Sequence, residues 1–315
     1  MSEPAHPNSA ELRFDGRVAV VTGAGRGLGR AYAELLASRG AQVVVNDLGS
    51  ALDGTGGDVG PAQEVVDGIR AAGGSAVAST DSVASEQGGR HIIDAALDHF
   101  GRIDILIHNA GNTSAIPLRE MSLADFDNIL DVHLRGGFNV TQPAYAKMCD
   151  NGYGRIVLTA SVNALYGNYN QAHYTAAKAG LWGLANVAAL EGAALGVKAN
   201  TIVPTAVTRM AAGVDTSIFP PMTPDMVSPM VGWMAHESCS ISGEMLISVA
   251  GRVARGFACE ARGVYRDHWT IEDVAENIDA IRDRSEMYFG DVIPAGQIEH
   301  LKYSFAMQQS AETKP

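Results

Sequence analysis

Two hydrophobic patterns alternate along the chain. Short, nearly continuous runs of Val, Ile and Leu are typical of buried strands, whereas longer segments with apolar residues every three or four positions are typical of helices. The pattern predicts strands at residues 17–21, 41–46, 103–108, 155–159, 198–203 and 244–249. It predicts helices at residues 28–38, 62–71, 89–100, 123–134 and 173–195.

This alternation of strand and helix predicts βαβ units. The expected fold is therefore α/β, a doubly wound (Rossmann) parallel sheet covered by helices on both faces. The alternation runs from residue 11 to residue 251 without a linker, so we expect one dinucleotide-binding and catalytic domain at 11–251. Residues 48–60, rich in Gly and Asp, are typical of a flexible insertion after the second strand.

A C-terminal extension, residues 252–315, follows the last predicted strand. Its best helix candidate is the segment 270–282. Thr270 can cap this helix, and Asp273, three residues on, is a short substitute for the usual capping-box Glu. We expect the extension to pack on the same domain or on a partner subunit.

Composition narrows the choice of partners and compartment. The 23 Lys and Arg residues against 35 Asp and Glu give a net charge of -12, which opposes nucleic-acid binding. The chain shows no signal-peptide core and no run of about 18 apolar residues, so we expect no membrane span and a cytoplasmic protein. Cys149, Cys239 and Cys259 are far apart without His-rich neighbours, so no metal site is expected.

A glycine-rich turn, Thr-Gly-Ala-Gly-Arg-Gly-Leu-Gly at 22–29, follows the first predicted strand and opens a helix. Such a turn lets the backbone approach a pyrophosphate, although a tight β-to-α turn explains the glycines equally well. Asp47 ends the second strand, where a carboxylate accepts from ribose hydroxyls and repels the extra phosphate of NADP. NAD is therefore the expected cofactor, although Arg26 suits a 2′-phosphate as well as a pyrophosphate.

Three polar residues point to catalysis. Tyr174 and Lys178 stand four residues apart in a helical segment, so their side chains share one face. Taken alone, such a pair is usually surface decoration. Ser161 lies thirteen residues before Tyr174, just after a predicted strand, at the carboxyl edge where doubly wound sheets bind ligands. The three side chains are therefore expected to converge beside the nicotinamide.

Together these motifs resemble the short-chain dehydrogenase/reductase family. The family pattern T-G-x-x-x-G-x-G, N-A-G, Ser and Y-x-x-x-K matches residues 22–29, 109–111, Ser161 and Tyr174 to Lys178, and the match covers about three quarters of the chain. The resemblance implies that Asp81 binds the adenine and that Pro204 with Thr208 borders the nicotinamide. The cofactor-binding residues implied by motif and resemblance are Gly23, Arg26, Gly27, Leu28, Gly29, Asp47, Asp81, Ser82, Asn109, Ala110, Gly111, Tyr174, Lys178, Pro204, Val207 and Thr208.

Two positions depart from the family pattern. Thr205 follows the proline after the sixth strand, where the family usually has Gly. His133 stands where the family usually has an Asn, which is thought to hold a water in a proton relay behind the lysine. His133 is therefore a fourth candidate catalytic residue. Either its side chain preserves the relay or a backbone carbonyl alone holds the water.

A narrower resemblance concerns the substrate. Residues 44–49 with the insertion, 131–136, 165–168 and 236–239 are similar to the (3R)-hydroxyacyl-CoA dehydrogenase module of the peroxisomal multifunctional enzyme and to its stand-alone bacterial relatives. This likeness implies oxidation of a fatty or steroid-side-chain 3-hydroxyacyl-CoA to the 3-oxoacyl-CoA. Tyr174 would be the general base, Lys178 would tune it and Ser161 would stabilise the oxyanion.

Alternatives remain for substrate, role and assembly. A free hydroxysteroid or another secondary alcohol is the competing substrate, and a catalytically silent NAD-responsive binding protein is the competing class. Small residues along 173–195 permit close helix packing across a two-fold axis or onto the sheet, and the family resemblance implies a homodimer or homotetramer. The candidate substrate walls are Val162, Asn163, Tyr169, Met210 and the loop at 211–230. The Met-rich character of this loop suits an adaptable lid and equally suits packing against the C-terminal extension.

Overall fold

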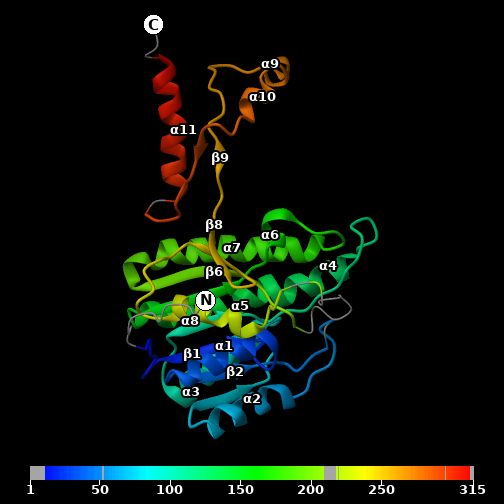
Figure 1. Cartoon of the computed structure of the whole chain (residues 1–315), viewed down its shortest axis with the longest axis vertical. Coiled ribbons are helices and arrows are strands. Elements are labelled where there is room, and N and C mark those ends of the chain that lie inside the picture. The colour runs from blue at the N-terminus through cyan, green and yellow to red at the C-terminus, as the bar shows by residue number, and fades with distance from the viewer. Residues whose placement is uncertain (1–10, 52, 209–217, 219, 295, 313–315) are drawn as a thin grey trace, which may run out of the picture.

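A central sheet carries helices on both faces (Figure 1). The computed structural model describes residues 11–51, 53–208, 218, 220–294 and 296–312. Its strands are β1 (Val18–Thr22), β2 (Gln42–Asn46), β3 (Ser75–Ser79), β4 (Ile105–His108), β5 (Gly154–Thr159), β6 (Val197–Thr205), β7 (Met245–Val249), β8 (Arg252–Gly256), β9 (Glu260–Ala261) and β10 (Met287–Tyr288).

The helices cover the sheet and continue into the C-terminal extension. A π-helical turn at Asp131–Arg135 joins α4 to α5, and 3-10 turns lie at Ala193–Leu195 and Pro224–Met226. The α-helices are α1 (Gly27–Ser38), α2 (Gly60–Ala71), α3 (Glu86–Phe100), α4 (Leu123–Leu130), α5 (Gly136–Asp150), α6 (Asn163–Tyr166), α7 (Ala172–Gly192), α8 (Ser228–Ala235), α9 (Ile271–Glu276), α10 (Ile278–Ile281) and α11 (Gln297–Glu312).

Within the described residues, the main sheet has the strand order β3-β2-β1-β4-β5-β6-β7-β8. Strands β1 to β7 are parallel, and β8 pairs antiparallel with β7. The order reverses between β1 and β4, and this switch point is where doubly wound sheets bind ligands. The predicted doubly wound fold is therefore confirmed.

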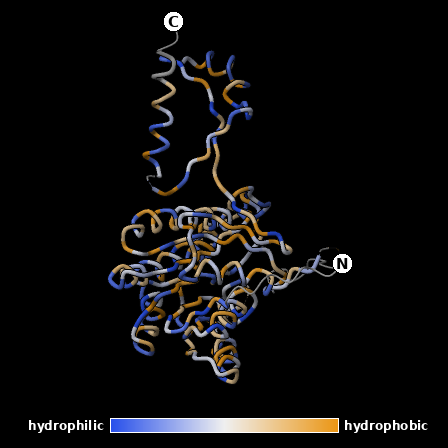
Figure 2. Tube along the Cα trace, turned by 60° about the vertical axis from the view of Figure 1, so that its left-hand side comes forward, coloured by the Kyte–Doolittle hydropathy of each residue, from blue (hydrophilic) through white to orange (hydrophobic). Residues whose placement is uncertain are grey.

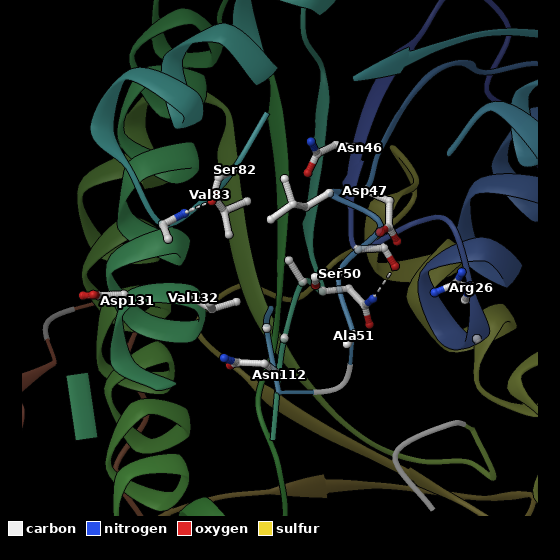
Figure 3. A pocket seen from close by; sticks show the side chains of 18 of the residues that line it. Arg26, Asn46, Asp47, Ser50, Ala51, Ser82, Val83, Asn112, Asp131 and Val132 are labelled. Atoms are coloured by element: carbon white, nitrogen blue, oxygen red, sulfur yellow. Dashed lines mark hydrogen bonds between the residues drawn. The ribbon is translucent and has the colours of Figure 1, made fainter. Parts of the chain in front are cut away.

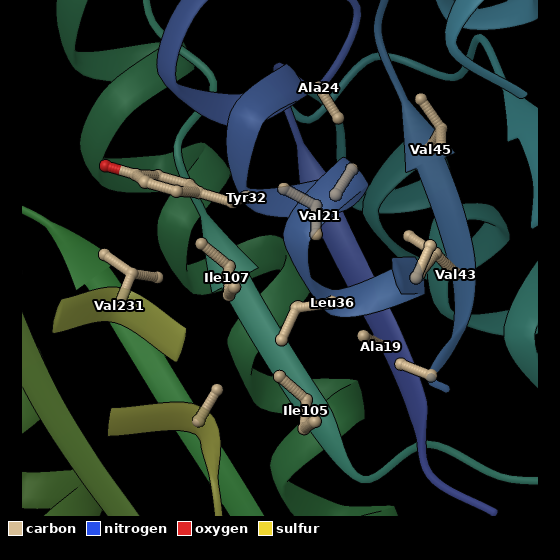
Figure 4. Packing of buried hydrophobic residues seen from close by; sticks show 14 of the residues in the cluster. Ala19, Val21, Ala24, Tyr32, Leu36, Val43, Val45, Ile105, Ile107 and Val231 are labelled. Carbon is tan, nitrogen blue, oxygen red and sulfur yellow. The ribbon is translucent and has the colours of Figure 1, made fainter. Parts of the chain in front are cut away.

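Alternate residues of each strand point to opposite faces of the sheet and pack in two separate hydrophobic cores. On one face, Val21 of β1 packs in a cluster with Leu36 of α1 and Val231 of α8 (Figure 4). On the other face, Val20 of β1 packs in a cluster with Leu181 of α7. Each fully buried aliphatic side chain contributes roughly 1.5–3 kcal/mol, so both faces hold the strand ends firmly at the ligand edge.

Some elements differ from the sequence prediction. Strand β3 was not predicted because its sequence, Ser-Ala-Val-Ala-Ser, has only one large apolar side chain. Helix α5 was not predicted because it begins with two glycines and contains Pro143, all poor helix formers. The segment 123–134 was predicted as one helix, whereas α4 ends at Leu130 and the π-helical turn follows. Helices α8 and α11 and the short strands β8, β9 and β10 were not predicted either.

Most of the C-terminal extension projects away from the sheet and its helices. Residues 257–294 and 296–312, here named the arm, leave the end of β8 in both views (Figures 1 and 2), and Ile293 returns to pack against the core on the α7 side of the sheet. The predicted helix at 270–282 is confirmed in two pieces, since Thr270 and Asp273 form the expected capping box and Asn277 separates α9 from α10. Several large apolar side chains of the arm are exposed, among them Phe257, Ile271, Phe289, Ile298 and Phe305.

Candidate active site

Close backbone contacts shape the turn between β1 and α1. Gly23 and Gly27 have φ angles of 62° and 55°, a region that favours glycine. A Cβ at Gly29 would lie 2.1 Å from the Gly23 carbonyl oxygen, so no side chain fits there. Arg26, the N-cap of α1, makes no side-chain cap. The first N–H groups of α1 are thus left to interact with an anion at this turn.

The Asp47 carboxylate is held by backbone donors at the end of β2. Its Oδ2 accepts from the Gly25 N–H at 2.8 Å, and its Oδ1 accepts from the Gly49 N–H at 2.7 Å. Figure 3 shows Asp47, Ser50 and Arg26 around one pocket. The carboxylate is therefore fixed at the place where an adenosine ribose would reach the second strand.

The insertion after β2 folds over this pocket. Ala51 and Gly54 are among the lining residues. The Asn128 side chain of α4 donates to the Asp53 carbonyl oxygen at 3.3 Å, and a Cβ at Gly54 would lie 2.8 Å from Asn112 Nδ2. The sequence indicates only a flexible insertion here. Its contact with α4 joins residues 75 positions apart, and no local pattern reveals it.

Asp81 follows β3 at the same edge of the sheet. The Ser79 hydroxyl donates to Asp81 Oδ2 at 3.3 Å, and His91 Nδ1 lies 3.2 Å from Oδ1. The Asn46 side chain donates to the Asp81 carbonyl oxygen at 2.9 Å. Asp81 and Ser82 both line the pocket, so three consecutive parallel strands bring polar groups to it.

Most of the predicted cofactor positions line this single pocket. They are Gly23, Arg26, Gly27, Leu28, Asp47, Asp81, Ser82, Asn109, Ala110, Gly111 and Thr208. The predicted positions outside its lining are Gly29, Tyr174, Lys178, Pro204 and Val207. Sequence reasoning missed Asn46, Leu48, Ser50, Ala51, Gly54, Val83, Ala84, Asn112, Asn128, Asp131 and Val132. Many of these residues are next to a motif residue in the sequence, and this adjacency was the signal that could have predicted them.

Ser161 and Tyr174 meet at the carboxyl end of β5. Their proximity is reflected in the pKa of Tyr174. Burial raises this pKa above its usual value, and the Ser161 side chain lowers it in part. The predicted convergence of this serine and tyrosine is therefore present in the structure.

Lys178 lies one turn further along α7 and is buried, with 3% of its surface exposed. Its Nζ donates to the Thr159 carbonyl oxygen at 2.6 Å and lies 5.6 Å from the centroid of the Tyr174 ring. Burial lowers the pKa of Lys178 to about 7. The remaining donors of the ammonium group are available to a ligand on the Tyr174 side.

His133 sits in the π-helical turn with 1% of its surface exposed. Its ring meets the Tyr174 ring edge-on at a centroid distance of 5.1 Å, and its Nε2 lies 2.8 Å from the Asn112 carbonyl oxygen. Burial, with a further contribution from Lys178, lowers the pKa of His133 well below its usual value. The neutral ring therefore donates from Nε2, and its buried Nδ1 has no partner among the described residues.

A buried chain of hydrogen bonds links this turn to the glycine-rich turn. The Thr22 hydroxyl oxygen accepts from the N–H groups of Asn109 and Ala110, each at 3.1 Å, and lies 3.0 Å from His108 Nδ1. His108 Nε2 lies 3.0 Å from the His133 carbonyl oxygen. Because a carbonyl only accepts, His108 carries its proton on Nε2 and Thr22 donates to Nδ1. Sequence reasoning missed this role of His108.

The predicted substrate walls are only partly described. Val162 and Tyr169 are exposed near α6, and the Asn163 side chain donates to Gln171 Oε1 at 2.7 Å. Met210 and residues 211–217 of the predicted lid lie outside the described residues. Residues 228–230, the end of that lid, instead begin α8, which packs on α1. Thr205 ends β6 in register with β7.

Comparison with known proteins decides the family. Residues 17–217, more than half of the chain, match the family described as short chain dehydrogenase. The chain belongs to this family. This short-chain dehydrogenase is 46% identical over 285 residues to peroxisomal multifunctional enzyme type 2 of Drosophila melanogaster, covering 89% of this chain and 47% of that protein. It therefore spans about half the length of that relative.

Two further relatives bear on the chemistry. The hydroxyacyl-CoA dehydrogenase ChsB1 of Mycobacterium tuberculosis is 38% identical over 263 residues, covering 78% of this chain and 80% of that protein. A solved structure of 7α-hydroxysteroid dehydrogenase, complexed with NADH and 7-oxo glycochenodeoxycholic acid, is 30% identical with a TM-score of 0.70. The match covers 76% of this chain and 95% of that one.

These relationships establish the general reaction. The short-chain dehydrogenase is an oxidoreductase that acts on CH–OH groups and uses a nicotinamide cofactor. Its residues fit a dinucleotide, because a side-chain-free turn, a helix N-terminus and the Asp47 carboxylate share one pocket. Among the described residues, no helix combines the length and hydropathy needed to cross a lipid bilayer.

Proposed function

We propose that the chain catalyses the NAD-dependent oxidation of a 3-hydroxyacyl-CoA to the 3-oxoacyl-CoA. The observation that carries the proposal is the grouping of Ser161, Tyr174 and buried Lys178 at the sheet edge that also holds the dinucleotide pocket. Lys178 Nζ lies 5.6 Å from the centroid of the Tyr174 ring and donates to the Thr159 carbonyl oxygen at the end of β5. The hydroxyacyl-CoA dehydrogenase and multifunctional-enzyme relatives support the acyl-CoA substrate.

NAD is the proposed form of the cofactor. Asp47 is fixed by two backbone N–H donors, so its negative charge stays at the pocket. A 2′-phosphate would be repelled there, whereas ribose hydroxyls would find an acceptor. Arg26, which lines the same pocket, is assigned to the pyrophosphate.

In the proposed mechanism, Tyr174 removes the proton of the substrate hydroxyl and Ser161 donates a hydrogen bond to the same oxygen. When bound, the nicotinamide supplies the acceptor for the hydride that leaves the carbinol carbon. Each unit by which the Tyr174 pKa falls needs about 1.4 kcal/mol of preference for the phenolate. Lys178 is the nearby cation that provides such preference, and it also binds the nicotinamide ribose.

His133 is proposed to serve the proton relay behind Lys178. Its Nδ1 is a buried acceptor without a partner among the described residues, in a ring that meets Tyr174 edge-on. A water there would accept from the Lys178 ammonium and donate to Nδ1, which satisfies both groups. The His133 carbonyl oxygen already has a partner in His108, whereas Nδ1 has none among the described residues, so the side chain is assigned to the water.

The substrate side offers an exposed apolar rim. Val162, Tyr166 and Tyr169, with exposed fractions of 41%, 81% and 93%, surround α6 beyond Ser161. We propose that the acyl chain or a steroid-derived side chain lies along this rim. The second candidate is a free hydroxysteroid, which the steroid-bound relative and the same aromatic rim favour.

We further propose a homodimer or homotetramer in which the arm packs on a partner subunit. The arm exposes Phe257, Phe289 and Phe305, and α5 and α7 expose Phe138 and Val187. Large exposed apolar side chains grouped in this way are typical of subunit interfaces. A monomeric mass in solution would contradict the assembly and leave the reaction untouched.

The test of the proposed function is NADH formation at 340 nm with a substrate panel. The panel holds a short, a long and a steroid-side-chain 3-hydroxyacyl-CoA, together with the corresponding free alcohols. Each is offered with NAD and, separately, with NADP. We expect turnover with NAD and CoA esters; turnover confined to free alcohols would overturn the acyl-CoA assignment.

A further inference from the structure

Two hydrogen bonds tie the loop after β4 to the start of α7. The Ile116 N–H donates to the Asn170 carbonyl oxygen at 2.8 Å, and Ser114 Oγ lies 2.8 Å from His173 Nε2. His173 directly precedes Tyr174. The loop therefore reaches the catalytic helix one residue away from the proposed base.

The His173 ring holds a single tautomer. The ring is fully buried, and the Tyr174 backbone N–H donates to its Nδ1 at 2.8 Å. A nitrogen that accepts carries no proton, so the neutral ring carries its proton on Nε2 and donates it to Ser114. One ring thus satisfies a backbone donor of α7 and a side-chain acceptor of the loop.

The surroundings of His173 favour this neutral form. Burial is the largest effect and lowers the pKa of His173, whereas the Asp125 carboxylate raises it in part. The other titratable ring nearby, His133, is also neutral because of its burial. If Nδ1 carried a proton, it would be a donor facing the Tyr174 N–H donor, and neither group would have an acceptor.

The same loop borders both parts of the site. It begins at Gly111 and Asn112, which line the dinucleotide pocket, and continues to Ser114 beside the start of α7. It therefore runs from the dinucleotide pocket to the start of α7, next to Tyr174. Sequence reasoning assigned no role to Ser114 or His173.

We propose that His173 is a positioning residue that holds the Ser114 loop and the Tyr174 backbone together through its two ring nitrogens. The proposal rests on the proposed role of Tyr174 as base. The Ser114 bond fixes a wall of the substrate side, so its loss raises KM. The Tyr174 bond fixes the start of the catalytic helix, so its loss lowers kcat.

Two substitutions separate the bonds. In His173→Asn, the amide oxygen takes the place of Nδ1 and accepts from Tyr174, but the side chain is too short for Ser114. In His173→Gln, the amide nitrogen takes the place of Nε2 and donates to Ser114, but the Tyr174 N–H loses its acceptor. Ser114→Ala removes only the loop bond. Thr113→Ala is the control, because its hydroxyl makes no hydrogen bond within the described part of the chain.

The experiment measures kcat, KM and melting temperature for these variants and for Ser114→Ala/His173→Asn, using the alcohol that the panel shows to be turned over. Loss of one neutral hydrogen bond corresponds to roughly a 3- to 10-fold effect. We expect KM to rise by that factor in Ser114→Ala, in His173→Asn and, without a further rise, in the double variant. We expect His173→Gln to lower kcat instead and to keep KM.

The proposal is overturned if KM is unchanged in Ser114→Ala and His173→Asn, if their effects add, or if Thr113→Ala raises KM equally. Nitrogen-15 NMR of the histidine rings is a readout independent of turnover. We expect a His173 signal with Nε2 protonated that disappears in His173→Asn, and a protonated Nδ1 would contradict the pairing. Retained turnover in Tyr174→Phe would instead overturn the proposed base, while the KM comparison still decides the loop bond.

Discussion

The proposed active site has two halves that are built by different means. The nucleotide half consists of the turn at 22–29, Asp47, the insertion and Asp81, and it is formed largely by backbone groups at successive strand ends. The catalytic half consists of Ser161, His133 and the first turns of α7, and side chains from distant elements form it, of which His133 and Lys178 are buried. A site built from backbone groups depends mainly on local sequence, whereas a site built from side chains of distant elements depends on tertiary packing.

This difference separates what each half does to the kinetics. Changes in the nucleotide half should act on cofactor affinity and cofactor choice, and changes in the catalytic half should act on turnover. Lys178 is where the halves join, because it lies beside Tyr174 and is also assigned to the nicotinamide ribose. Substitutions in each half, and at Lys178 itself, therefore test whether the two halves act separately.

Tyr174→Phe should have the largest effect on turnover. It removes the proposed acid/base hydroxyl, and positioned proton transfer contributes roughly 10²- to 10⁴-fold to the rate. We expect kcat to fall by that range while the Kd for NAD, measured by calorimetry, stays within about twofold. Tyr303→Phe, in α11 of the arm, is the matched control and should keep kcat. A large change in the Kd for NAD in Tyr174→Phe would show that the catalytic half also binds the cofactor, which contradicts the division.

The residues that the sequence assigns to the proposed nucleotide half come together in the structure for a physical reason. Gly23, Gly27, Gly29 and Asp47 lie within one βαβ unit, so their spacing alone fixes their places at the strand ends. The Y-x-x-x-K spacing and Ser161 were predictable in the same way, because one helix and one strand end position them.

The rest depends on contacts that no local pattern contains. The bond of His173 to Ser114 joins residues 59 positions apart, and that of Asn128 to Asp53 joins residues 75 apart. The orientation of His133 depends on a π-helical turn, where the sequence predicts an ordinary helix. Periodicity identifies the elements, but tertiary packing decides which side chains meet between them.

Lys178→Met should affect both halves. We expect kcat to fall at least 10²-fold and NAD to bind more weakly, since one ammonium group serves both sides. Lys147→Met, at an exposed position of α5, is the control and should change neither. Unchanged cofactor affinity in Lys178→Met would move this residue wholly into the catalytic half.

The burial of Lys178 also predicts that the free energy of unfolding of the cofactor-free protein depends on pH. Burial lowers the pKa of Lys178 from 10.5 to about 7 in the folded state. Between these values the unfolded chain binds more protons, so the free energy of unfolding should rise with pH, by on the order of 5 kcal/mol over the window. Urea unfolding from pH 7 to pH 10 should show this rise in the wild type and Lys147→Met, but not in Lys178→Met. An identical slope in Lys178→Met would contradict the burial effect.

Asp47→Ser should have a smaller effect, confined to cofactor choice. It removes the charge proposed to exclude the 2′-phosphate, and a charge-assisted hydrogen bond corresponds to about 1.5–3 kcal/mol. We expect the ratio of kcat/KM for NAD over NADP to fall roughly 10- to 100-fold, with kcat for NAD little changed. Asp94→Ser, at an exposed position of α3, matches the change in charge and should leave the ratio unaltered. If the ratio is unchanged in Asp47→Ser, Asp47 does not exclude the 2′-phosphate, and Arg26 becomes the residue from which cofactor choice is argued.

Asn128→Ala should have the smallest effect, and it tests whether the insertion belongs to the nucleotide half. The variant removes the bond from α4 to the Asp53 carbonyl oxygen and a long bond of 3.4 Å that the Asn128 amide oxygen accepts from Asn112. A neutral hydrogen bond corresponds to roughly a 3- to 10-fold change. We expect the Kd for NAD to rise by that factor through faster release, measured by stopped-flow fluorescence of NADH, with kcat unchanged or slightly raised. Asn151→Ala is the matched control, because this exposed asparagine precedes β5, at the edge of the sheet opposite the pocket. If release is as slow in Asn128→Ala as in the wild type, the insertion covers the pocket without holding the cofactor, and the backbone turn alone retains it.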